Sequence, residues 1–125
     1  MEQANTPAAT SSGIFELLEP DIVNQAEGSV QIAFTVKPEF MIPPGIVQGG
    51  IVAAMLDMTM AMAAGGGIST ASMHFEILRP VSGPRLRVHG SIAKHGRRIV
   101  FAEAEMYDGD DALVARGRQT AVPIA

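Results

Sequence analysis

One stretch of this sequence decides the fold: residues 45–67 read GIVQGGIVAAMLDMTMAMAAGGG. It is an apolar run that two adjacent glycines, Gly49 and Gly50, open and three consecutive glycines close. A run that is apolar nearly all round is typical of a helix buried at the centre of a domain. We therefore expect a helix from about Gly49 to Ala64, which the glycine triplet ends. We reject a membrane span, because Asp57 stands in its middle and alanine and glycine fill its second half.

Asp57 is the only ionisable residue in this run. Because an ionised carboxylate is costly to remove from water, its place inside an apolar helix needs a reason. A carboxylate in such surroundings is a candidate general base or nucleophile. The alternative is a structural aspartate that bonds a core hydroxyl or a backbone amide. A helix cap is excluded, because the residue lies in the middle of the helix.

Shorter patterns surround the central helix. Before it we expect a short helix at 14–18, capped by Ser11 or Ser12, a strand at 30–37 and a loop at 40–47. After it, alternating apolar and polar residues predict strands only, at 71–78, 86–92, 98–107 and 112–121. Their short connections imply antiparallel neighbours. The order of elements predicts an α+β fold, with one antiparallel sheet packed on one central helix.

Several of these strands carry apolar residues on both faces, such as Ile99 and Phe101 against Val100 and Ala102. One helix covers only one face of a sheet. We therefore expect the chain to form oligomers that cover part of the remainder.

The composition of the 125 residues limits the possible functions. We expect one domain at 13–125 after a mobile tail at 1–12, which has no signal-peptide pattern, and hence a cytoplasmic protein. There is no cysteine, and the three histidines show no ligand spacing, so we expect no metal site. The net charge of −4 argues against nucleic-acid binding. Eight of the nine basic residues lie from Arg79 onward, where a local patch could take an anionic ligand.

Two motifs resemble a known family. Gln48, Gly49 and Gly50 open the helix, with Asp57 eight residues after Gly49, and residues 70–80 read TASMHFEILRP. Together with the last strands, they resemble the hotdog-fold acyl-CoA thioesterases of the phenylacetate-pathway (PaaI-like) branch of the 4-hydroxybenzoyl-CoA thioesterase superfamily. The resemblance covers about residues 13–121. It implies a sheet wrapped around the helix, an acyl-CoA substrate, no separate cofactor, and a homodimer that is often doubled into a tetramer.

The resemblance also implies roles for single residues. Asp57 acts as general base or nucleophile, and the backbone amides of Gly49 and Gly50 polarise the thioester carbonyl. Thr70 holds water or orients Asp57, unless it merely opens a strand. Gln48 stands where the family has a histidine, and Ile42 where it often has an asparagine. Gln48 can donate and accept hydrogen bonds but cannot titrate.

Three arginines are candidate ligands for the phosphates of coenzyme A. Arg97 and Arg98 follow a glycine in a predicted turn, and Arg79 ends the motif at 70–80. A planar guanidinium group suits phosphate oxygens. The alternative for Arg97 and Arg98 is a solvated turn.

The spacing along the helix predicts where the site lies. Eight helical residues span about 12 Å, so one small carbonyl cannot contact both the helix start and Asp57 of the same chain. If both act on one thioester, they come from different subunits. The site then lies at a homodimer interface, with two sites per dimer.

Hydrolysis of a small or medium acyl-CoA is therefore the predicted function. One alternative is a protein that binds acyl-CoA or a small acid without turnover, which Gln48 and Ile42 motivate. A second is a structural oligomer in which Asp57 only closes an interface. A hotdog hydratase is disfavoured, because no histidine follows Asp57 within two turns of helix.

Overall fold

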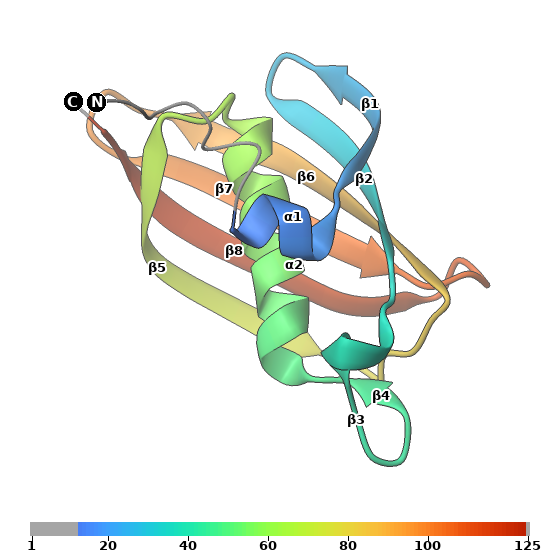
Figure 1. Ribbon diagram of the computed structural model, residues 1–125. Coiled ribbons are helices and arrows are strands. Elements are labelled where there is room, and N and C mark those ends of the chain that lie inside the picture. The colour runs from blue at the N-terminus through green and yellow to red at the C-terminus, as the bar shows by residue number, and fades with distance from the viewer. Residues whose placement is uncertain (1–12, 125) are drawn as a thin grey trace, which may run out of the picture.

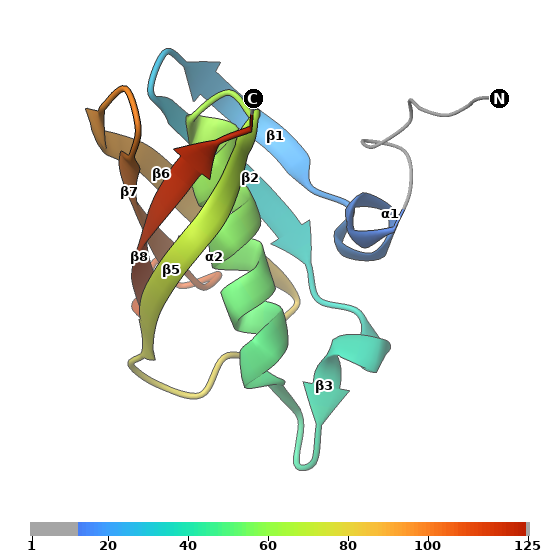
Figure 2. The same cartoon turned by 90° about the vertical axis from the view of Figure 1, so that its left-hand side faces the viewer.

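A computed structural model of the chain describes residues 13–124. They form a twisted antiparallel sheet and a long helix, α2 (Gly49–Ala63), that lies along one face of it (Figure 1). The short helix α1 (Ile14–Leu18) lies on the same side of the sheet, outside α2, as the turned view shows (Figure 2). The predicted α+β arrangement is confirmed. The predicted tail, with Ser11 and Ser12 as caps, falls outside the described residues, and Gly13 precedes α1 without a side-chain cap.

Six strands build the sheet in the order β1-β2-β6-β7-β8-β5, and all neighbours are antiparallel. A separate two-stranded ribbon, β3-β4, precedes α2. Because the chain leaves the sheet at β2 and re-enters it at the opposite edge as β5, the segment that includes α2 crosses β6, β7 and β8. The bounds are β1 Asp21–Ala26, β2 Ser29–Thr35, the single 3-10 turn η3 Pro38–Phe40, β3 Met41–Ile42, β4 Ile46–Val47, β5 Ile68–Ile77, β6 Arg85–His95, β7 Val100–Tyr107 and β8 Leu113–Pro123.

The predicted central helix is confirmed almost to the residue. It ends at Ala63, and Gly65, Gly66 and Gly67 follow with φ values of 84°, 79° and 70°. Only glycine adopts three such left-handed conformations in a row at little cost, so the triplet ends the helix as predicted. The four strands after the helix are also confirmed, with ends that differ by a few residues.

The prediction before the helix is incomplete. β1 is not predicted, because all its residues are exposed and its register shifts between Ile22 and Asn24, so no two-residue period marks it. The predicted plain loop at 40–47 is wrong, since it contains β3 and β4 on either side of a turn. Strands of two residues are too short to leave a periodic pattern.

The helix approaches the sheet closely where Thr59 faces Gly90 of β6. A Cβ on Gly90 would lie 2.9 Å from the backbone oxygen of Thr59, so glycine is what allows the two backbones to meet. Thr59 is fully buried, and its hydroxyl donates to the carbonyl of Met55 at 2.8 Å. Met55, Met58 and Met60 of the same helix are buried in the core.

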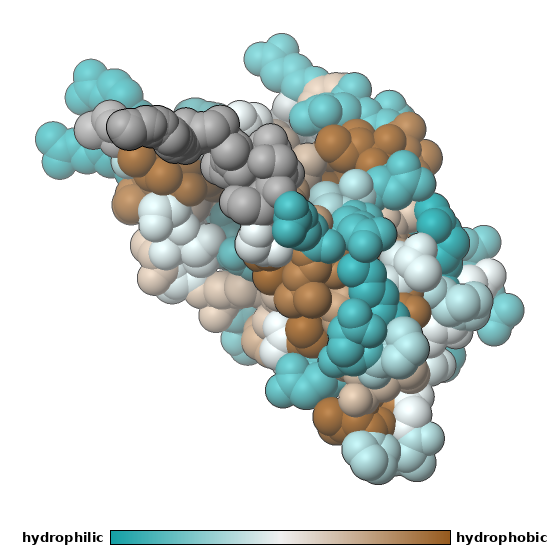
Figure 3. Space-filling view, viewed as in Figure 1, coloured by the Kyte–Doolittle hydropathy of each residue, from teal (hydrophilic) through white to brown (hydrophobic). Residues whose placement is uncertain are grey.

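The helix covers only one face of the sheet, as predicted. On the outer face Ile99 and Phe101 remain 43% and 40% exposed, while the residues that alternate with them on β7 are buried. On the helix side, Figure 3 shows apolar patches beside β1 and at the tip of the β3-β4 ribbon, where Ile22, Val23 and Ile42 are exposed. No helix within residues 13–124 is long and apolar enough to cross a membrane.

The contact at Gly90 predicts the effect of a single methyl group. Gly90→Ala should destabilise the fold by about 1–3 kcal/mol, because the Thr59 carbonyl can give way only if the helix moves. Urea denaturation measures the loss. Gly109→Ala, in the β7-β8 turn where a Cβ meets nothing within 4 Å, is the matched control and should change stability by less than about 0.5 kcal/mol. Equal effects at both positions would contradict the close approach.

Candidate functional site

Asp57 faces β5 and β8 from the side of α2, and it is half-buried rather than enclosed. Its Oδ1 accepts two hydrogen bonds of 2.7 Å, from the hydroxyl of Thr70 on β5 and from Nε2 of Gln119 on β8. No donor within residues 13–124 reaches Oδ2. The carboxylate is therefore fixed through one oxygen and open at the other, which suits a general base or a nucleophile.

A β-bulge turns Thr70 toward Asp57. Regular alternation would place Thr70 on the same face as Ser72, whose hydroxyl bonds that of Thr120 at 2.6 Å on the outer face. Instead, the register of β5 against β8 shifts between Thr70 and Ser72, so that Thr70 pairs with the buried Ala121 on the helix side. Bulges redirect side chains in this way next to functional sites.

Gln119 is a hydrogen-bond partner of Asp57 that was not predicted from the sequence. It is 3% exposed and lies on the inner face of β8, where its neighbours along that face, Gly117 and Ala121, are small. A long polar residue at an inward strand position is the signal that could have identified it. Its Nε2 also donates to Thr70 at 3.3 Å, whereas its Oε1 is buried with no donor among the described residues. An unpaired buried carbonyl costs about 1–3 kcal/mol, so stability does not explain this amide.

The start of α2 presents free amide groups. Gln48 is the N-cap residue, and its Oε1 accepts a hydrogen bond of 3.2 Å from the N–H of Ile51. In the described part of the chain, the N–H groups of Gly49 and Gly50 have no acceptor, as is usual in the first turn of a helix. A Cβ on Gly50 would lie 2.8 Å from the capping Oε1, whereas one on Gly49 would contact Ile77 at an ordinary 3.6 Å. These two amides can donate to a carbonyl oxygen.

The carboxylate and the free amides lie at opposite ends of β5. Asp57 bonds Thr70 near the start of this strand, and Gly49 lies beside Ile77 at its end. The side of β5 away from β8 pairs with no other strand of the described chain. Within one chain the structure therefore does not bring the glycine amides to the carboxylate, as the spacing along the helix predicts.

The three arginines are exposed and are not brought together. Arg97 and Arg98 lie in the β6-β7 turn, at the end of the sheet where Ala121 pairs with Thr70. Arg79 follows β5 at the opposite end. A single chain thus offers no common phosphate site to all three.

The outer face of the sheet carries charged residues and two open clefts. The larger, of about 630 Å³, is lined in part by Lys94 and Phe101. In the smaller, of about 390 Å³, Arg116 donates to Glu76 at 2.8 Å, and this hydrogen bond and the charge of the guanidinium lower the pKa of Glu76. Neither cleft includes Asp57 or the glycine pair.

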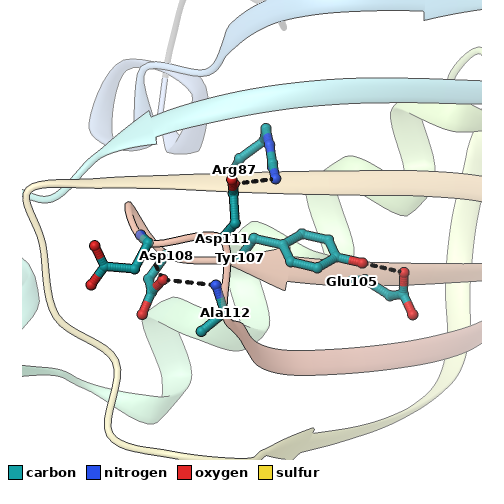
Figure 4. A network of polar contacts seen from close by, with 7 residues as sticks. Arg87, Glu105, Tyr107, Asp108, Asp111 and Ala112 are labelled. Carbon is teal, nitrogen blue, oxygen red and sulfur yellow. Dashed lines mark hydrogen bonds and ion pairs between the residues drawn. The ribbon is translucent and has the colours of Figure 1, made fainter.

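A polar network stabilises the β7-β8 turn, at the end of the sheet opposite Thr70 (Figure 4). Oδ1 of Asp108 accepts two backbone N–H groups of the turn, and Arg87 forms a salt bridge of 2.9 Å with Asp111. The hydroxyl of Tyr107 donates to Glu105 at 2.8 Å, and this hydrogen bond raises the pKa of the phenol. These groups bond one another at the turn, so we assign them a structural role.

An antiparallel sheet that packs around one long helix is the architecture of the hotdog-fold thioesterases. Solved structures agree. A conserved protein of Pseudomonas aeruginosa is 26% identical, with a TM-score of 0.83 over 94% of this chain and 100% of its own. A Ralstonia eutropha protein, named as a thioesterase related to phenylacetic acid degradation, is 27% identical, with a TM-score of 0.82 over 94% and 92%. The Escherichia coli PaaI protein, from the phenylacetic acid degradation operon, shares the fold at 19% identity, with a TM-score of 0.81 over 86% of each chain.

Residues 38–122 match the family described as acyl-CoA thioesterase N-terminal domain, and the chain belongs to this family. A Saccharolobus solfataricus protein named as an esterase is 25% identical over 108 residues, which are 82% of this chain and 77% of that protein. The predicted membership of the hotdog thioesterases is confirmed, and the similarity to the Ralstonia eutropha protein agrees with the PaaI-like branch. These matches support a thioesterase-type hydrolase.

The cap at the start of α2 predicts a difference between its two glycines. Gly50→Ala should be less stable than Gly49→Ala by about 1 kcal/mol, a typical value for an N-cap, because its methyl group displaces the Gln48 amide from Ile51. Urea denaturation of both variants measures the difference. In a Gln48→Ala background there is no capping side chain to displace, and the difference should vanish. A difference that persists there would assign it to another contact of Gly50.

Proposed function

We propose that this protein hydrolyses a small or medium acyl-CoA thioester to the free acid and coenzyme A. Asp57 is the general base or nucleophile, and the backbone amides of Gly49 and Gly50 polarise the thioester carbonyl. No metal or separate cofactor takes part. One observation carries the proposal: the carboxylate and the free amides lie at the two ends of the same unpaired edge strand.

An antiparallel pair of β5 strands from two copies would complete the site. Such a pair sets the start of one strand against the end of the other. Asp57 and Thr70 of one subunit would then meet Gly49 and Gly50 of its partner, and a twofold axis would make two such sites. The apolar outer face around Ile99 and Phe101 would remain exposed in this dimer, which supports the doubling into a tetramer.

The free oxygen of Asp57 offers two routes to hydrolysis. As a general base, Oδ2 takes a proton from water, the hydroxide attacks the carbonyl carbon, and the carbon–sulfur bond breaks as the thiolate is protonated. As a nucleophile, Oδ2 attacks the carbon itself and expels the thiolate, and water then hydrolyses the mixed anhydride. In both routes the glycine N–H groups stabilise the negative oxygen of the tetrahedral intermediate. Thr70 orients the carboxylate by holding Oδ1.

The same dimer would assemble the phosphate ligands. Arg97 and Arg98 lie at the Thr70 end of the sheet, and Arg79 at the other end. Antiparallel pairing of β5 would bring Arg79 of the partner subunit toward Arg97 and Arg98, beside each Asp57. A cluster of three guanidinium groups would attract the phosphates of coenzyme A despite the net negative charge of the chain.

A protein that binds acyl-CoA without turnover is the second candidate. Gln48 caps its own helix, and Ile42 is an exposed apolar residue, so neither supplies a titratable group to the site. The two candidates differ in thiol release from short, medium and aromatic acyl-CoAs. Binding of acyl-CoA without thiol release would favour the second.

Asp57→Asn should lower turnover by about 10²–10⁴-fold, the usual contribution of a positioned acid–base group. The amide keeps the shape of the side chain, so the variant should stay folded and dimeric. Thiol release, circular dichroism and sedimentation measure the three properties. A variant that loses the dimer but keeps its specific activity would give Asp57 a purely structural role.

Two inactive variants should restore each other if the site is shared between subunits. Gly49→Pro removes one of the two N–H groups at the first helical position, where proline is well tolerated. Mixed with Asp57→Asn under conditions of subunit exchange, it should recover about a quarter of wild-type turnover, because half of the dimers are mixed and each mixed dimer has one intact site of two. Each variant alone should stay inactive. If the mixture also stays inactive although mixed dimers form, the site does not span two subunits.

A further inference from the structure

The contact between Gln119 and Asp57 is the strongest feature of the molecule that neither the family resemblance nor the predicted site includes. Gln119 reaches Asp57 across the core from β8, and it is one of two buried polar residues among those described. Its Nε2 donates to Oδ1 of Asp57 at 2.7 Å and to Thr70 at 3.3 Å. The hydroxyl of Thr70 donates to the same Oδ1 at 2.7 Å. The three side chains therefore form a closed triangle of hydrogen bonds.

The carboxylate dictates which way the Gln119 amide points. An ionised carboxylate only accepts hydrogen bonds, so Nε2 must face Oδ1. The reverse orientation would set the amide oxygen against a carboxylate oxygen, with no proton between them. The observed orientation leaves Oε1 buried without a donor in the described chain. The contact with Asp57 thus outweighs the penalty of an unpaired carbonyl.

An apolar side chain would suit the core better than Gln119 does. A methionine of similar length would bury no unpaired oxygen at this position. Asp57 is half-buried, so it would keep Thr70 as a donor and could gain water. Residues that lower stability are typical of functional sites rather than of structural ones.

We propose that Gln119 is a positioning residue for the Asp57 carboxylate. This inference rests on the proposed thioesterase function. With Thr70 it fixes Oδ1 by two donors from two strands, so that the carboxylate cannot rotate and Oδ2 points steadily at the water or the thioester. Gln119 touches neither substrate nor water in this role. It acts only through Asp57.

The test is Gln119→Met, studied for turnover and for stability together. Its kcat should fall about 10- to 100-fold, as expected when a reacting group is misplaced, while KM changes little because substrate binding is untouched. Its melting temperature should stay equal or rise. Gln25→Met, on the exposed strand β1, makes the same chemical change away from the site and should alter neither property.

A fall in both kcat and melting temperature would make Gln119 a structural residue, and an unchanged kcat would remove its role altogether. Wild-type protein that releases no thiol from any acyl-CoA would instead defeat the proposed function. The contact is then judged by NMR of the Gln119 side-chain amide. One Nε2 proton should resonate downfield in the wild type and shift upfield in Asp57→Ala. The same amide spectrum in both proteins would overturn the inference.

Discussion

The close approach of α2 to the sheet at Gly90 is the constraint on which the rest of the structure depends. At this point the backbone of Gly90 contacts both the side chain and the backbone of Thr59. The helix therefore lies close enough to the sheet for Asp57 to bond Thr70 on β5 and Gln119 on β8. Because these two hydrogen bonds are 2.7 Å long, the distance between the helix and the sheet can vary little. The packing of the core and the geometry of the carboxylate are therefore set by the same contact.

The central helix and the strands after it could be predicted because their signals are local. The apolar run and the glycines at both its ends lie within 23 residues, and alternation marks each later strand. β1 could not be predicted, since it exists only through its pairing with β2 and shows no buried face of its own. The β3-β4 ribbon could not be predicted either, because strands of two residues are too short to show an alternation of apolar and polar residues.

The residues of the candidate site also differ in whether local sequence could identify them. Asp57 could be identified from the sequence, because one charge in an apolar run is conspicuous. Thr70 came from the family resemblance, and alternation alone would have placed it on the wrong face, since a bulge is invisible to a two-residue period. Gln119 and the separation of the arginines depend on which strands are neighbours. That order is set by tertiary pairing, which no single segment encodes.

The two edges of the sheet are unequal, and this limits how the chain can associate. β1 is short and irregular, with a bulge in the middle, and such an edge is a poor template for another strand. β5 is ten residues long and regular over most of its length. A sheet with one receptive edge can be extended only once, because the added copy turns its own receptive edge inward. Edge-to-edge extension of the sheet would then stop at two copies, and the irregular strand β1 would keep the chain from forming open-ended fibres.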